Sequence, residues 1–204
     1  GLYLEPQLVM KSYVTILGFF QTQCILAAIQ PGVPFIIGAE SSAIDKLTLT
    51  TANPEYPPSY LVEYLGNPTG IHFRADNIVF DTTGDLIHIG STNGPCICLI
   101  LNPLINMAAK YRNGFLVEDS GPNNNTIYFI VDNLIWSADN DGLTNFDTLF
   151  NIHSYKSSAL FPNIFGAITN TSVGQIVSSP KGKAFVIEGS SFVTIETCLL
   201  GGFE

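Results

Sequence analysis

The chain has 204 residues, of which 46% are hydrophobic and only 12% are charged, and its formal net charge is −9. This length suffices for one well-buried core and is marginal for two domains. With 8 Lys and Arg against 17 Asp and Glu, the composition argues against a nucleic-acid partner and against attachment to anionic membranes, which both require clustered cations. The remaining surface must be rich in Ser, Thr, Asn and Gly, which is common outside the cell.

The start of the chain predicts export. Residues 1–9 are treated as an extraneous or upstream segment. Residues 10–28 have a basic start at Lys11, an apolar stretch and small residues at the end, which is typical of a secretory signal peptide. A buried helix or a membrane anchor is the alternative, but residues 21–23 are polar and interrupt the run too early for a span of about 20 residues. The sequence therefore predicts a secreted protein, with residues 29–36 as a linker and first strand.

Short apolar segments separated by turn residues follow in chain order. Strands or strand-like apolar runs are predicted at 35–37, 44–50, 60–65, 70–73, 77–80, 86–89, 96–104, 115–118, 126–131, 134–137, 167–169, 174–178, 184–187 and 192–197. One or two helical turns are predicted at 105–111, and Asn113-Gly114 predicts a tight turn. Many short strands with almost no helical periodicity predict an all-β protein.

Three stretches recur at a constant interval: 71–80, 127–136 and, more weakly, 183–192. The aligned positions are Phe73, Phe129 and Phe185, each 56 residues apart, and at the same interval Asp76, Asp132 and Glu188. A fixed period indicates one supersecondary unit used three times, with the acidic residues in structural turns. About four strands per unit predict a single domain over residues 37–204 with a β-trefoil-like barrel, and a β-sandwich is the alternative.

Three cysteines, Cys96, Cys98 and Cys198, would remain after the signal peptide is removed. In an oxidising compartment, Cys198 is expected to pair with Cys96 or Cys98, leaving the third free or bridged to another chain. The three histidines are scattered, and Cys-x-Cys is not a usual zinc spacing, so no metal site is predicted.

No catalytic motif is complete. The stretch from Asp81 to Gly84 resembles the Asp-Thr-Gly of aspartic proteases, with Asp119 as a possible partner. Thr83 is inserted in the motif, and a dyad needs two carboxylates held by identical tight turns. There is also no Gly-x-Ser-x-Gly elbow. The sequence therefore predicts a protein that is not an enzyme and has no cofactor.

Two kinds of candidate site remain. Asn124 and Asn170 begin N-glycosylation sequons. Trp136, Tyr128 and Asp132 could form a lectin-like site, in which an aromatic ring stacks on a sugar and a carboxylate orients its hydroxyls. The same aromatic residues serve equally well as core, which is the favoured interpretation.

Segments 10–28, 129–136 and 184–192, with Cys198 just after, loosely resemble fungal secreted cell-wall proteins with a β-rich domain. The chain departs from that group because it has no Ser/Thr-rich stalk and no C-terminal anchor signal. The resemblance implies a non-enzymatic surface protein with a structural or adhesive role, whose loops meet wall polysaccharide. The alternatives are a carbohydrate-binding, lectin-like module and a secreted effector or inhibitor that binds an extracellular protein through a loop such as 53–59.

Overall fold

The computed structural model describes residues 1–82, 84–106, 110–119, 125–137, 145–155, 163–174, 183–189 and 191–201. Every regular element in these ranges is a strand. The strands are β1 (Leu2–Glu5), β2 (Leu8–Val9), β3 (Thr15–Leu17), β4 (Ile25–Ala28), β5 (Ile36–Ile37), β6 (Ala43–Thr51), β7 (Tyr60–Tyr64), β8 (Phe73–Asp81), β9 (Asp85–Gly90), β10 (Cys96–Leu101), β11 (Leu104–Ile105), β12 (Lys110–Glu118), β13 (Ile127–Asp132), β14 (Ile135–Ser137), β15 (Asn145–His153), β16 (Ile164–Thr169), β17 (Ser172–Gly174), β18 (Lys183–Glu188), β19 (Ser191–Glu196) and β20 (Leu199–Gly201). The described ranges contain no helix that could cross a membrane.

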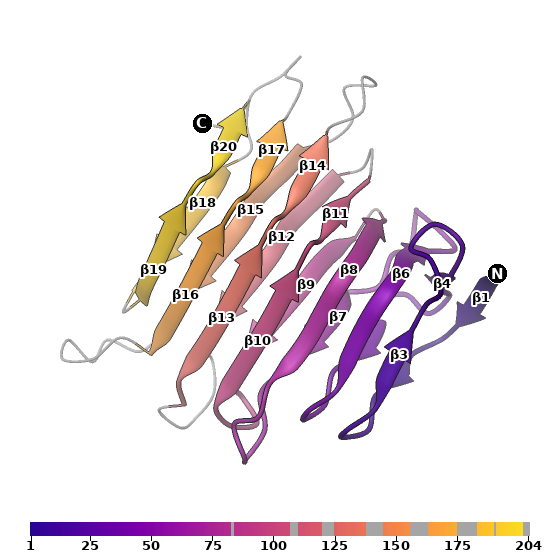
Figure 1. Cartoon of the computed structure of the whole chain (residues 1–204), viewed down its shortest axis with the longest axis horizontal. Helices are drawn as coiled ribbons and strands as arrows, with labels where there is room; N and C mark the ends of the chain where they lie inside the picture. Colours follow the sequence, from indigo (N-terminus) through magenta and orange to yellow (C-terminus); the bar gives the residue numbers. More distant parts are fainter. Residues whose placement is uncertain are drawn as a thin grey trace.

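The strands form two sheets, one of 13 and one of 7 strands, and successive coils of the chain stack on each other (Figure 1). Each of β14, β15 and β16 pairs in parallel with the strand three places later, β17, β18 and β19 respectively. Paired residues lie from 23 positions apart, as for Leu2 and Ile25, to 37 apart, as for Ile135 and Ser172. The architecture is therefore a parallel β-solenoid, in which each coil contacts only its neighbours.

The predicted β-trefoil and its alternative, the β-sandwich, are both wrong. Those folds are built from antiparallel strands joined by hairpins, whereas every described strand pair here is parallel. The predicted strand positions agree with the structure for most elements, but short apolar segments and turn residues do not report strand direction. Strands buried in parallel sheets read as almost continuous apolar runs.

The 56-residue interval has a physical origin for two of its three copies. Phe73 aligns with Cys98, and Cys98 aligns with Phe129, so the two phenylalanines occupy the same position two coils apart. Phe185 lies in the other sheet, where it aligns with Phe150. The third copy is therefore not equivalent, and the repeating unit is one coil.

Two local predictions are also wrong. The helical turns expected at 105–111 are not formed in the described part, because Ile105 ends β11 and β12 begins at Lys110. The expected turn at Asn113-Gly114 lies inside β12, where the main-chain N–H of Asn113 donates to Asp85 Oδ1 at 3.1 Å. Pairing with two neighbouring strands outweighs the local turn preference.

The core lies between the inward faces of the two sheets and is built from aligned rows. In the smaller sheet the rings of Phe115, Phe150 and Phe185 stack with centroids 4.8 and 5.3 Å apart. Trp136 is buried and 2% exposed, as the core interpretation predicted. Each fully buried ring of this size contributes roughly 1.5–3 kcal/mol through the area removed from water.

One corner of the solenoid repeats a left-handed residue from coil to coil, inside β8 in one coil and between two strands of the same coil in the next three. We call it the corner row: Asn77, Asn102, Asn133 and Asn170, with φ between 50° and 57°. Asn tolerates this conformation better than other residues with a Cβ. Asn133 Nδ2 donates to Asn102 Oδ1 at 2.9 Å, and Asn102 Nδ2 donates to Asp76 Oδ1 at 3.0 Å. The corner therefore ties neighbouring coils together and fixes where each strand turns.

The cysteines do not form the predicted disulfide. All four are free. Cys96 and Cys98 are buried in β10, whereas Cys198 follows β19, three strands further along the sheet. Three steps of about 4.8 Å separate them by roughly 14 Å, well beyond the Cα separation that a disulfide can bridge.

Residues at the start of the chain belong to the first coils. β1 pairs with β4, β4 pairs with β6, and Ala27 and Ala28 are 2% exposed. The signal peptide at 10–28 and its cleavage stay predictions, as does the division of the chain into 1–9, 10–28, 29–36 and 37–204.

Candidate ligand-binding face

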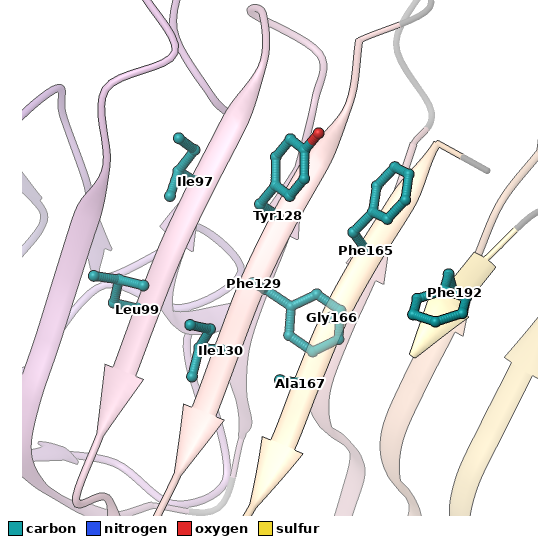
Figure 2. Close-up of a pocket in the computed structure, with 9 residues that line it drawn as sticks. All are labelled: Ile97, Leu99, Tyr128, Phe129, Ile130, Phe165, Gly166, Ala167 and Phe192. Atoms are coloured by element: carbon teal, nitrogen blue, oxygen red, sulfur yellow. The ribbon is translucent and has the colours of Figure 1, made fainter. Parts of the chain in front are cut away.

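The outward side of three adjacent strands, β10, β13 and β16, and of the start of the next, β19, carries apolar side chains (Figure 2). Further along β19 the position aligned with Ala167 is Thr194. One row joins Ile97, Tyr128, Phe165 and Phe192, which are aligned from strand to strand. A second row joins Leu99, Ile130 and Ala167. We call these seven residues the apolar face. Tyr128 is 49%, Ile130 40% and Phe192 63% exposed.

The alternation of β13 explains why the face forms. Its residues are alternately buried and exposed, with Ile127, Phe129 and Val131 inward and Tyr128 and Ile130 outward. In most half-buried strands the outward positions are polar. Here both sides of the strand are apolar, so the sheet presents hydrocarbon to solvent. Exposed apolar patches of this kind mark binding surfaces or ligand grooves.

The face is hollowed over β16. The hollow has a volume of about 300 Å³ and is lined by the apolar face together with Phe129 and Gly166. A Cβ on Gly166 would lie 2.2 Å from Cε1 and Cζ of Phe129, so only glycine leaves room for this ring. The Phe129 ring lies next to Gly166 in Figure 2. On the outward side of β16 the small side chain of Ala167 leaves the depression between larger side chains, while Gly166 makes room for the Phe129 ring on the inner side.

The aromatic residues follow the rise of the solenoid. The rings of Tyr128 and Phe165 are nearly parallel, with centroids 5.2 Å apart, and those of Phe165 and Phe192 are 6.5 Å apart. Neighbouring strands are about 4.8 Å apart. The row therefore offers a ligand an apolar contact that repeats once per coil.

A polar row borders the apolar face where the strands reach the corner. Asp132 Oδ1 accepts hydrogen bonds from Thr169 Oγ1 at 2.6 Å and from Asn170 Nδ2 at 2.9 Å. These bonds favour the ionised carboxylate and hold the pKa of Asp132 below its usual value. Asp132 is therefore an acceptor at neutral pH, and a carboxylate has about four lone-pair positions in all, more than these bonds use.

The structure brings together only two of the three predicted ligand-binding residues. Tyr128 and Asp132 lie on the same outward side of β13, whereas Trp136 is buried on β14 and takes no part in the face. Sequence reasoning missed Phe165, Phe192 and the aliphatic residues of the face. The available signal was the run from Cys96 to Leu101, which is apolar at every position.

The outward side of the smaller sheet is different, because it carries charged side chains on β7, β9 and β12. His88 lies between two carboxylates, with Nδ1 3.0 Å from Glu63 Oε1 and Nε2 3.1 Å from Glu118 Oε1. Burial disfavours the charged ring, but the two hydrogen bonds outweigh it and raise the pKa of His88 to about 9. At neutral pH this histidine is a cation bridging three strands.

Other predicted residues lie apart from the face. Asp119 is fully buried and accepts hydrogen bonds from Ser154 Oγ at 2.6 Å and from the N–H of Tyr155 at 2.7 Å. Asp81 ends β8 in the larger sheet, whereas Asp119 follows β12 of the smaller sheet. Burial raises the pKa of the Asp81 carboxyl. Asn170 is exposed, whereas Asn124 lies outside the described residues. Within the described ranges, no cluster of His, Cys, Asp and Glu could hold a metal ion.

No family model matches the chain, and neither a curated protein nor a solved structure is similar to it. The resemblance to fungal cell-wall proteins thus stays a prediction without support from related proteins.

Proposed function

We propose that the protein is a non-enzymatic, adhesive module that binds neutral polysaccharide through the apolar face. The single observation that carries this proposal is the pairing of two parallel stripes on one surface, hydrocarbon on β10, β13, β16 and β19 and hydrogen-bonding groups at the corner beside it. Sugar rings have the same division, with apolar C–H faces and hydroxyl rims. Ligand sites generally combine an apolar lining with a few polar groups that fix orientation.

Charge narrows the class of glycan. The chain has a net charge of −9. On β8, next to the face, Arg74 aligns with Leu99 and is paired with Asp76 on its own strand. An acidic polysaccharide would therefore meet repulsion and find no free guanidinium on β8. A neutral glycan meets neither obstacle.

The arrangement of titratable groups supports a binding role over catalysis. His88 is engaged at both ring nitrogens and stays protonated at neutral pH, so it is unsuited to act as a general base. On the apolar side Asp132 is held ionised by its hydrogen bonds. Predicted secretion would place the protein where polysaccharides are found, and that location is part of the proposal.

The test is binding of the full chain to a glycan array and to insoluble β-glucan, mannan and chitin. Tyr128→Ala should weaken binding about tenfold, or 1.4 kcal/mol, because Tyr128 is exposed at the centre of the face. Tyr56→Ala is the matched control, since Tyr56 is 62% exposed in a loop outside the face. Both variants should keep the circular dichroism spectrum of the parent. Absence of binding to any glycan, or equal losses in the two variants, would contradict the proposal.

A protein partner is the second candidate, because the hollow over β16 is lined by apolar residues and could receive an apolar side chain. A second copy of the chain is the partner that can be tested directly. Sedimentation that shows dimers in the parent and monomers in Ile130→Glu, together with a flat glycan array, would favour this candidate over the first.

A further inference from the structure

We infer that the ligand is an extended, unbranched β-linked glycan, such as a β-1,4-linked chain, that lies along the solenoid axis with one sugar unit per coil. This inference rests on the proposed function and adds the direction, linkage and length of the bound chain. It depends on three features of the described residues: the direction of the rows, their spacing and their two ends.

The direction follows from the register. Each row of the apolar face crosses from strand to strand at aligned positions, so it runs across the strands and along the axis on which the coils stack. The polar groups at the corner run the same way, from Asn102 through Asn133 to Asn170. A chain lying along a single strand would leave the apolar face after two residues, at Asp132 or Thr169. A glycan lying along the solenoid axis stays in contact with both the apolar face and the polar groups at the corner.

The spacing selects the linkage. Successive contacts repeat at the strand separation of about 4.8 Å, which agrees with the 5.2 Å between the rings of Tyr128 and Phe165. This step is close to the length of one sugar unit in an extended β-1,4-linked chain. In such a chain each ring can meet an equivalent coil. A β-1,3-linked or α-1,4-linked chain curves into a helix and would leave the row after one or two units.

The two ends of the face set the number of units. On β8 the aligned outward residue is Arg74, paired with Asp76, so the hydrocarbon stops between β8 and β10. At the other end Phe192 on β19 is the last aromatic of the row. Four strands, β10, β13, β16 and β19, therefore provide four sites for consecutive sugars. The hollow at Gly166 and Ala167 lies under the third of them.

The experiment is titration calorimetry of the full chain with oligosaccharides of two to six units. The arms are β-1,4-linked glucose, β-1,4-linked N-acetylglucosamine, β-1,3-linked glucose and α-1,4-linked glucose. We expect affinity to rise with each unit up to four and then to level off. The extended tetrasaccharides should bind about tenfold more tightly than the helical ones. Comparison of the β-1,4-linked glucose and N-acetylglucosamine oligosaccharides shows whether the ligand is a glucan or a chitin-like chain.

Two variants test whether the glycan binds on the apolar face. Ala167→Arg places a long cation in the middle of the hollow and should reduce tetrasaccharide affinity at least about tenfold. Ser172→Arg is the control, because Ser172 is exposed on β17, outside the face. Its affinity should stay within about twofold.

The outcomes separate this inference from the proposed function. Equal affinities for extended and helical chains, or no gain beyond two units, would overturn the inference, while loss of binding in Tyr128→Ala would still support the proposed function. Absence of binding in every arm would overturn both.

Discussion

The two outward faces of the solenoid are both built on parallel strands, but their side chains interact differently. On the smaller sheet His88 bonds to Glu63 and to Glu118, which come from the two strands that flank its own. On the larger sheet the aligned residues of the apolar face are mostly hydrocarbon, and they are exposed at Tyr128, Ile130 and Phe192 and half-buried elsewhere. The first face completes its interactions within the chain, and the second leaves apolar surface that a ligand could cover. Stability should therefore depend on the polar face, and binding on the apolar one.

The largest effect should come from breaking the histidine bridge. His88→Ala leaves two carboxylates facing one another without the cation between them, and removing one partner of a buried ion pair costs about 3–5 kcal/mol. Urea unfolding followed by circular dichroism measures the loss. His88→Lys should recover part of it, because the cation is restored. A change below about 0.5 kcal/mol in His88→Ala would mean that the bridge does not support the fold.

The same bridge should give stability a defined pH dependence. The pKa of His88 is raised from its ordinary value of 6.5 to about 9 in the folded chain. A group whose folded pKa is raised stabilises the fold fully below its unfolded pKa, and that stabilisation is lost as pH rises through the folded pKa. The free energy of unfolding should thus decline between pH 6.5 and 9. The control is His88→Ala, in which this decline should be absent.

A smaller effect is expected at the corner that borders the apolar face. Asn133 has φ of +57°, and its Nδ2 donates to Asn102. Asn133→Ala loses the hydrogen bond and strains the backbone, which should cost about 1–2 kcal/mol. Asn133→Gly loses the bond but accepts the conformation, so it should cost less. If glycine were as damaging as alanine, the left-handed backbone would not be the reason for asparagine at this position.

The smallest effect on stability should come from the apolar face itself. Ile130→Ser changes a side chain that is 40% exposed, so the free energy of unfolding should change by less than about 1 kcal/mol. Glycan binding should fall in the same variant. A stability loss as large as that of His88→Ala would show that the face serves the fold, and the contrast between the two surfaces would then fail.

Part of the candidate site could be predicted from the sequence. Tyr128 and Asp132 fit a sugar site as an aromatic ring with a nearby carboxylate, and alternation along β13 puts both on its outward side. Trp136 was included because an aromatic residue near an acid fits a sugar site, but its position on β14 turns it inward. Phe165 and Phe192 could not be added, since their alignment with Tyr128 depends on pairing between strands 37 and 27 residues apart.

The sequence by itself determined that the chain is all-β, where most strands lie, and that Asp76 and Asp132 recur 56 residues apart. These features depend on local alternation and on turn residues, which are read within a few positions. Only the tertiary structure decided that the strands are parallel, that the unit is one coil, and that Cys198 is too far from Cys96 to pair with it. Those outcomes depend on long-range register, because each residue's partner is set by the length of an entire coil and not by its neighbours in the chain.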